Sequence, residues 1–111
     1  MSNTKISQLI ARRTSLLEEL GSLTQVLHGS WVERYSVCSR KGCKCHQGDR
    51  HGPRYYVVVS EDGHQRQKYI SLSQVPAALK GIEQYQRLQA IVEEITQINL
   101  ELIKERAYAD S

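Results

Sequence analysis

Apolar residues recur at intervals of three and four over residues 4–28. This spacing is typical of an amphipathic helix that buries one face. The stripe comprises Ile6, Leu9, Ile10, Leu16, Leu17, Leu20, Leu23 and Leu27. Thr4 or Asn3 suits the helix start, and Gly29 suits a left-handed end. Gly21 lies inside the pattern and costs a helix about 1 kcal/mol relative to alanine. Despite this cost, we expect the helix to continue through Gly21, because the apolar pattern extends beyond it.

A second apolar pattern predicts a longer helix over residues 74–107. Pro76 is compatible with its first turn. The stripe comprises Leu79, Ile82, Leu88, Ile91, Val92, Ile95, Ile98, Leu102 and Ile103. Several of these residues are seven apart, as in a coiled coil. We therefore expect the two helices to pair as a long antiparallel, coiled-coil-like hairpin.

Between the predicted helices, three short segments are rich in Val, Ile, Tyr and Trp and predict strands. They are SWVERYSV at 30–37, RYYVVVSE at 54–61 and QKYISLS at 67–73. Asp62 and Gly63 predict a two-residue hairpin turn. The expected fold is α+β, a single domain over residues 1–111 in which residues 29–72 form a small three-stranded antiparallel meander carried by the helices.

The three cysteines of the chain lie together in the segment CSRKGCKCHQGDRHGP, residues 38–53. This segment has few apolar side chains with which to hold its shape, so a cross-link is needed to order it. Cys38, Cys43 and Cys45 have the spacing C-x4-C-x-C, and one histidine would complete a tetrahedral Cys3His zinc site. The sequence therefore predicts a zinc-stapled loop.

Two histidines are candidates for the fourth ligand. His51 is favoured, because the following Gly-Pro turn would direct its ring back towards the thiolates. His46 is the alternative, although it directly follows Cys45 and adjacent side chains point in divergent directions. Redox chemistry and unmodified free thiols are the alternatives to zinc. A catalytic zinc would need a general base nearby, and Asp49 is the only carboxylate in the segment. We therefore expect no enzymatic activity.

The first residues, MSNTKISQLIARR, do not have the pattern of a secretory signal. No apolar run approaches the roughly 20 residues that span a bilayer. We therefore expect a cytoplasmic protein with no membrane partner, in a reducing compartment where clustered cysteines bind metals more often than they form disulfides.

Basic residues are concentrated around the cysteines, although the net charge of the whole chain is only +3. The cations between residues 34 and 68 are Arg34, Arg40, Lys41, Lys44, Arg50, Arg54, Arg66 and Lys68. Such a cluster attracts a phosphate backbone, so we expect binding of DNA or RNA; ordinary solvated surface charge is the alternative. Trp31, Tyr55, Tyr56 and Tyr69 would stack on bases or pack the meander against the helix ends.

The apolar stripes are wider than a two-helix seam requires, because they include Ile10, Leu17, Val92 and Ile103. A second hypothesis is therefore a protein-interaction module. It would pair through its helices as a homodimer, or dock through the basic residues around the cysteines onto an acidic partner protein or a larger complex.

Residues 29–76 resemble a family of short prokaryotic proteins of unknown function. The resemblance lies in the stretch GSWVERY, the C-x4-C-x-C cluster, the HGP turn and the hairpin that leads to a basic strand and a long helix. It implies Cys38, Cys43, Cys45 and His51 as the metal ligands. Arg54 stands where the family usually has an aromatic residue, and Lys41 where proline is common, so this chain is more basic there. The resemblance implies no activity.

Overall fold

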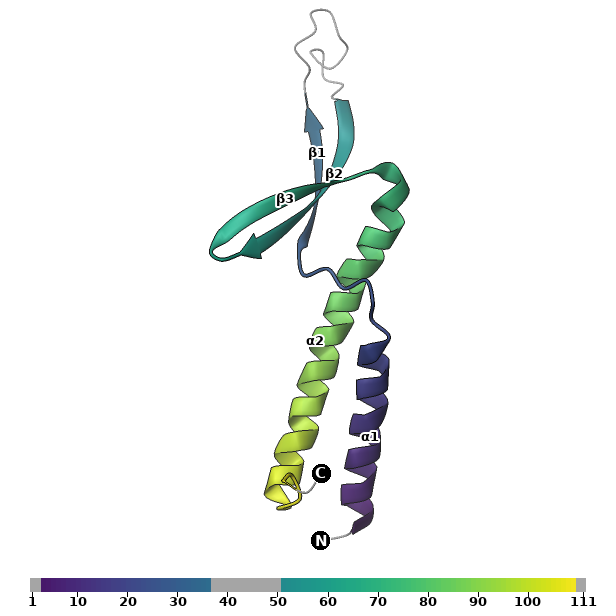
Figure 1. Cartoon of the computed structure of the whole chain (residues 1–111), viewed down its shortest axis with the longest axis vertical. Helices are drawn as coiled ribbons and strands as arrows, with labels where there is room; N and C mark the ends of the chain where they lie inside the picture. The colour runs from purple at the N-terminus through teal and green to yellow at the C-terminus, as the bar shows by residue number, and fades with distance from the viewer. Residues whose placement is uncertain (1–2, 37–50, 110–111) are drawn as a thin grey trace, which may run out of the picture. The chain divides into compact units, whose positions relative to one another are not determined.

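The computed structural model describes residues 3–36 and 51–109, and for His51 the backbone alone. Along the chain these residues form α1 (Asn3–Gly21), β1 (Ser30–Ser36), β2 (His51–Glu61), β3 (His64–Ile70), a 3-10 turn (Leu72–Gln74) and α2 (Val75–Lys104) (Figure 1). The α+β class is confirmed. No helix in these ranges is long and apolar enough to cross a membrane.

The contacts of the chain divide it into two compact units. The helical unit comprises Met1–Val26 and Glu83–Ser111, and the sheet unit comprises Leu27–Ile82. Helix α2 contributes its first residues to the sheet unit and the remainder to the helical unit. That the chain is a single domain stays a prediction.

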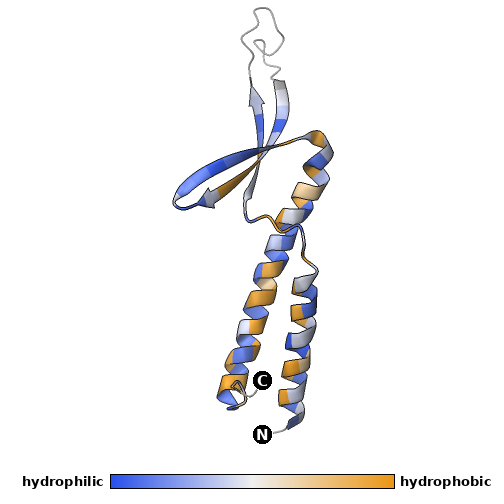
Figure 2. Ribbon diagram, viewed as in Figure 1, coloured by the Kyte–Doolittle hydropathy of each residue, from blue (hydrophilic) through white to orange (hydrophobic). Residues whose placement is uncertain are grey.

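In the helical unit, α1 packs against the later part of α2. The buried core consists of Leu16, Ile91, Ile98 and Leu102, and a shell of half-buried apolar side chains surrounds it: Ile6, Leu9, Ile10, Leu20, Leu23, Ile95 and Ala107. Apolar residues recur along both helices (Figure 2). Each core residue belongs to one of the two predicted stripes, which therefore identified the buried faces.

The predicted helix over residues 4–28 is too long at its C-terminal end, because α1 ends at Gly21. The amide of Ser22 donates to the carbonyl of Glu19 at 2.9 Å, and the Ser22 hydroxyl donates to the same oxygen at 2.6 Å. The amide of Leu23 donates to the carbonyl of Leu20 at 3.1 Å. These bonds satisfy carbonyls that a continuing helix would use, and glycine is the residue that loses most backbone entropy in a helix.

Helix α2 ends close to the predicted position, in a Schellman motif. Arg106 adopts the left-handed conformation with φ 58°, where glycine is the usual residue. The amide of Ala107 donates to the carbonyl of Leu102 at 2.8 Å, and the amide of Arg106 donates to that of Ile103 at 3.0 Å. Ala107 also packs against the helical core, which is the apolar contact that accompanies this motif.

In the sheet unit, the described strands form a three-stranded antiparallel sheet in the order β1-β2-β3, as predicted. The β2–β3 turn has the predicted residues, with Asp62 at φ 51° and Gly63 at φ 79°. Positive φ at both central positions is required by a type I′ hairpin turn. Strand β2 begins earlier than predicted, at His51, which pairs with Ser36 of β1.

One face of this sheet, here the inner face, packs against the start of α2. Val57 and Ile70 are buried with Ala78 of α2, and six half-buried side chains surround them: Leu27, Trp31, Tyr55, Val59, Val75 and Ile82. The rings of Trp31 and Tyr55 stack with centroids 5.4 Å apart. The sheet therefore has a second core, separate from that of the helical unit.

Gly29 does not end a helix in a left-handed conformation, as the sequence predicted, but lies against β2. A Cβ at this position would come within 2.7 Å of Val57 Cγ1 and 2.9 Å of the Val58 carbonyl oxygen. Glycine is therefore required here because the backbone approaches a strand closely, and helix termination plays no part.

Candidate nucleic-acid interface

The predicted zinc ligands lie largely outside the described residues. Cys38, Cys43, Cys45 and the alternative ligand His46 fall in the range 37–50, and His51 is described by its backbone alone. Within the described ranges, no group of three or more His, Cys, Asp or Glu residues is placed to hold a metal ion. The two ends of the predicted loop are adjacent, because Ser36 and His51 are partners in the sheet.

The predicted phosphate-binding cations divide into two groups. Arg40, Lys41, Lys44 and Arg50 lie outside the described residues. Arg34, Arg54, Arg66 and Lys68 are described, and the sheet register places them on opposite faces. The four described cations are therefore divided between the two faces of the sheet, and the prediction that the whole set binds phosphates stays a prediction.

Arg34 and Arg54 lie on the face of the sheet that is turned away from α2, here the outer face. By register and strand alternation this face comprises Ser30, Val32, Arg34, Arg54, Tyr56, Val58, Gln67 and Tyr69. Arg34 and Arg54 are direct cross-strand partners, and both are exposed. Like charges in this position destabilise a sheet unless something neutralises them.

Two tyrosines occupy the next row of the outer face. Tyr56 and Tyr69 are cross-strand partners, and their rings meet edge to face with centroids 5.8 Å apart. The Arg34 guanidinium carbon lies 5.3 Å from the centroid of the Tyr56 ring. Because Trp31 and Tyr55 are in the inner core, the structure separates the four candidate aromatic residues into two that pack the sheet and two that lie on its outer face.

Arg66 and Lys68 lie on the inner face, opposite Val59 and Val57. Both are nevertheless exposed, because β3 is covered only at Ile70, next to the start of α2. Arg66 donates to Glu61 across the hairpin at 3.0 Å, in an ion pair that is itself exposed. Such a pair contributes little to stability and leaves the guanidinium available to another anion.

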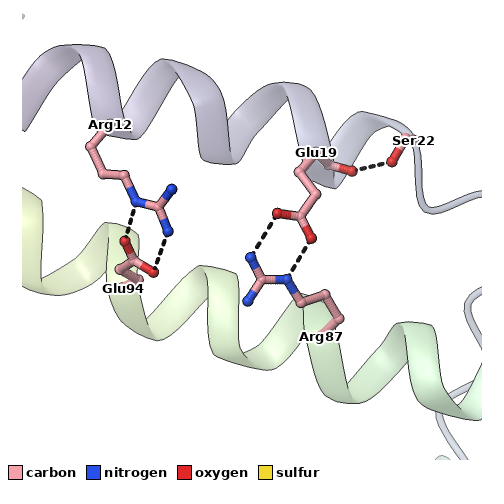
Figure 3. Close-up of polar contacts among 5 residues, drawn as sticks. All are labelled: Arg12, Glu19, Ser22, Arg87 and Glu94. Carbon is pink, nitrogen blue, oxygen red and sulfur yellow. Dashed lines mark hydrogen bonds and ion pairs between the residues drawn. The ribbon is translucent and has the colours of Figure 1, made fainter.

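The charges of the helical unit are, in contrast, matched across its two helices. Arg12 of α1 forms a bidentate pair with Glu94 of α2, and Glu19 of α1 receives a bidentate pair from Arg87 of α2 (Figure 3). Lys5 donates to Glu101 at 2.7 Å. The residue number of the partner falls along α2 as that of the residue rises along α1, so the two helices run antiparallel.

The ion pairs also shift the ionisation of their partners. The pKa of Glu19 is lowered from its ordinary value mainly by hydrogen bonds from Arg87, and that of Glu94 is lowered in the same way by Arg12. The pKa of Lys5 is raised by its hydrogen bond to Glu101. Each of these groups is therefore held in its charged form by its partner.

The two units differ in net charge. Leu27–Ile82 contains nine Lys and Arg against four Asp and Glu, a net charge of +5, whereas the helical unit contains six against eight, a net charge of −2. Among the described residues, Arg34, Arg54 and Lys68 have no carboxylate partner. The unbalanced positive charge thus belongs to the sheet unit.

A family model for a domain of unknown function, DUF6788, matches residues 6–80, more than half of the chain. The chain belongs to the DUF6788 family. The match includes α1 from residue 6 onward, the sheet and the first residues of α2. No match was found among curated proteins or among solved structures. The family assignment agrees with the resemblance to proteins of unknown function, and it supplies no activity.

Proposed function

We propose that this protein is a non-enzymatic, zinc-binding protein that binds nucleic acid, as an accessory or regulatory component. The observation that carries the proposal is the juxtaposition of Arg34 and Arg54 on the outer face, with no carboxylate partner among the described residues. Phosphate groups of a nucleic acid, one at each guanidinium group, would neutralise both cations and remove their repulsion.

The rest of the sheet unit supports the same target. Its net charge of +5 includes the cations of residues 37–50, and Arg66 and Lys68 are exposed on the other face. Nucleic acid is the polyanion whose regular phosphates match a surface with several separated cations, and binding releases its counterions. In the helical unit, Glu19, Glu94 and Glu101 are held in ion pairs with cations of the same unit, so these three carboxylates are neutralised there.

We propose zinc, held by Cys38, Cys43, Cys45 and His51, as the cross-link of the loop. Cys38 follows Ser36 by two residues, so their Cα atoms are at most about 7 Å apart. His51 is the cross-strand partner of Ser36, with Cα atoms about 5 Å apart. Chain geometry therefore allows Cys38 and His51, the first and last of the four proposed ligands, to bind the same ion. Bound zinc would order the loop without taking part in a reaction.

Zinc content tests this part of the proposal. Protein purified without added metal is expected to contain about one zinc per chain, held by the four ligands, and His51→Ala is expected to lose most of it. His46→Ala is the matched control and is expected to keep the metal. Loss of zinc from His46→Ala alone would assign the fourth ligand to His46, and freely titrating thiols with no zinc would reject the site.

The helical unit is proposed to be a coiled-coil-like hairpin. Lys5, Arg12 and Glu19 are seven residues apart, as are their respective partners Glu101, Glu94 and Arg87. Charged pairs with this period flank the seam of a coiled coil. This pairing favours one direction and one register of the two helices.

A direct binding assay tests the nucleic-acid proposal. At low salt, the zinc-loaded protein is expected to bind labelled oligonucleotides. The double variant Arg34→Ala and Arg54→Ala is expected to bind at least tenfold more weakly, because about two phosphates are no longer neutralised. Arg66→Ala with Lys68→Ala is also expected to weaken binding. Lys104→Ala removes an exposed cation from the helical unit and is the matched control, with affinity unchanged. Wild-type protein that binds no oligonucleotide would refute the proposal.

A protein-interaction module is the second candidate, favoured by apolar residues that the helical unit leaves exposed. Leu17, Val92 and Ile103 are 51%, 47% and 52% exposed, whereas Ile10 packs against the core. A homodimer through this surface, or docking into a larger complex, would cover them. Light scattering at increasing concentration tests the homodimer, and Val92→Lys should then return the protein to a monomer. A monomeric wild type that binds no oligonucleotide would leave docking to a different protein as the favoured role.

A further inference from the structure

The outer face of the sheet arranges its side chains in rows of different chemistry. One row is the Arg34 and Arg54 pair, the next is Val32, Tyr56 and Tyr69, and the third is Ser30, Val58 and Gln67. Residues two apart along a strand are about 7 Å apart. A cationic row and an aromatic row therefore run side by side across the strands.

The aromatic row is open to solvent at one end. Tyr69 is 54% exposed, and Tyr56 is half-buried beside it. The inner core is filled by other residues, including Trp31 and Tyr55, so the two outer tyrosines do not pack against α2. An aromatic ring exposed on a sheet buries little of its apolar area, and a planar ligand that stacks on it would recover that contribution.

From this arrangement we propose that the outer face binds single-stranded nucleic acid, with a base stacked on Tyr69 and the adjoining phosphates held by Arg34 and Arg54. The inference rests on the proposed nucleic-acid binding and adds the class of strand that is bound. Within one nucleotide, the base and the phosphate are separated by a distance comparable to the spacing of the two rows. The Arg34 guanidinium lies over the Tyr56 ring, so its positive charge is at the boundary between the cationic row and the aromatic row.

Single strands fit this face better than a duplex does. In a duplex the flat faces of the bases are covered by their neighbours, so a tyrosine on a sheet cannot reach them without unstacking. In a single strand each base presents its ring face, and stacking on an aromatic side chain is tolerant of sequence. Stacking on a base and binding of a phosphate use groups that DNA and RNA have in common. The proposed ligand is therefore a single strand of either nucleic acid.

Three variants isolate stacking from charge. Tyr69→Leu keeps an apolar side chain in the strand and removes the ring, whereas Tyr69→Phe keeps the ring and removes only the hydroxyl. Tyr108→Leu is the matched control, because Tyr108 is a similarly exposed tyrosine, 48%, in the helical unit. Thermal unfolding of each variant shows whether the fold is retained. If the Leu variant is unstable, the comparison of single strands with duplex in the wild type keeps the inference testable.

The experiment measures the affinity of the zinc-loaded full chain for oligo(dT), oligo(U) and a DNA duplex of the same length at one salt concentration. The single strands are expected to bind more tightly than the duplex. Tyr69→Leu should weaken single-strand binding by about 5- to 150-fold, the range that corresponds to loss of one stacked base. It should change duplex binding less than about twofold, because the duplex meets only the charge. Tyr69→Phe and Tyr108→Leu should bind all three like the wild type. A preference for oligo(dT) or oligo(U) would support the inference and identify the strand.

Equal affinity for single strands and duplex, with no loss in Tyr69→Leu, would overturn the stacking inference while leaving the proposed nucleic-acid binding in place. A similar loss in Tyr69→Phe and Tyr69→Leu would also overturn it, because the hydroxyl and not the ring would then be responsible. Absence of binding to every oligonucleotide would overturn the proposed function and the inference together.

Discussion

Replacement of Gly29 by alanine is expected to destabilise the sheet unit, because the backbone at this position lies against β2. The added Cβ would lie 2.7 Å from Val57 Cγ1, 2.9 Å from the Val58 carbonyl oxygen and 3.0 Å from Val59 Cγ1. Carbon atoms in contact are ordinarily about 3.5–4.0 Å apart, so the two valine methyl groups would have to move by about 0.5–1.3 Å.

Two features limit this movement. The Val58 oxygen belongs to the backbone of the central strand, and Val57 is buried in the inner core. Inserting a methyl group into such a site costs about 1–3 kcal/mol, and we expect about 2 kcal/mol for Gly29→Ala. For a chain of this length that corresponds to a fall in melting temperature of about 6–12 °C.

The sheet unit contains its own spectroscopic probe. Trp31 is the only tryptophan of the chain and stacks on Tyr55 in the inner core. Its fluorescence during urea unfolding should therefore report the loss of stability. Gly21→Ala is the matched control, since a Cβ there meets nothing within 4 Å and the residue ends a helix; it should be neutral or stabilising by up to about 1 kcal/mol. A Gly29→Ala protein as stable as the wild type would refute the argument for close packing.

Further predictions concern the helical unit. Arg106→Gly should raise the stability of this unit by about 1 kcal/mol in thermal unfolding, because the residue is left-handed at φ 58°; no gain would show that the strain is relieved elsewhere. Glu19→Arg should lower the melting temperature at low salt, and adding Arg87→Glu should restore it, since the pair is exchanged across the helices; equal melting temperatures for the single and double variants would show that the pair contributes nothing. The pKa values of Glu19, Glu94 and Glu101 are lowered from 4.5, so the unfolded chain takes up these protons at a higher pH than the folded chain. Stability should therefore fall as the pH drops below about 4.5, and a melting temperature unchanged down to the acid limit of folding would contradict this.

Local patterns in the sequence were sufficient to predict the elements and the buried faces. Leu16 and Ile91, one from each predicted stripe, are both buried in the core of the helical unit. Residues three and four apart lie on one face of a helix, so the spacing alone indicates which face is buried. Asp62 and Gly63 were sufficient to predict the turn, since few residues accept positive φ in succession.

The predictions failed where a residue has two possible roles that only tertiary packing decides. Gly29 resembles a helix end in the sequence, but it is required by its contact with β2, and α1 had already ended at Gly21. The end of α1 depends on competing hydrogen bonds from Ser22, which have no distinctive pattern.

The division of the basic cluster also required the structure. Strand alternation separates Arg66 from Tyr69 in the sequence, but the face that α2 covers depends on contacts with Ala78 and Ile82, which are distant in the chain. Arg34 and Arg54 are partners because of the register between β1 and β2, two strands that are separated in the sequence by residues 37–50. No local pattern determines that register.

The dependence of nucleic-acid affinity on salt tests the central claim most directly. The logarithm of the association constant for a single strand should fall linearly with the logarithm of the salt concentration. The slope should become shallower by about 1.4 when Arg34 and Arg54 are both replaced by alanine, about 0.7 for each phosphate that the protein no longer neutralises. A wild-type affinity that does not change with salt, or a slope that is the same in the double variant, would contradict the account.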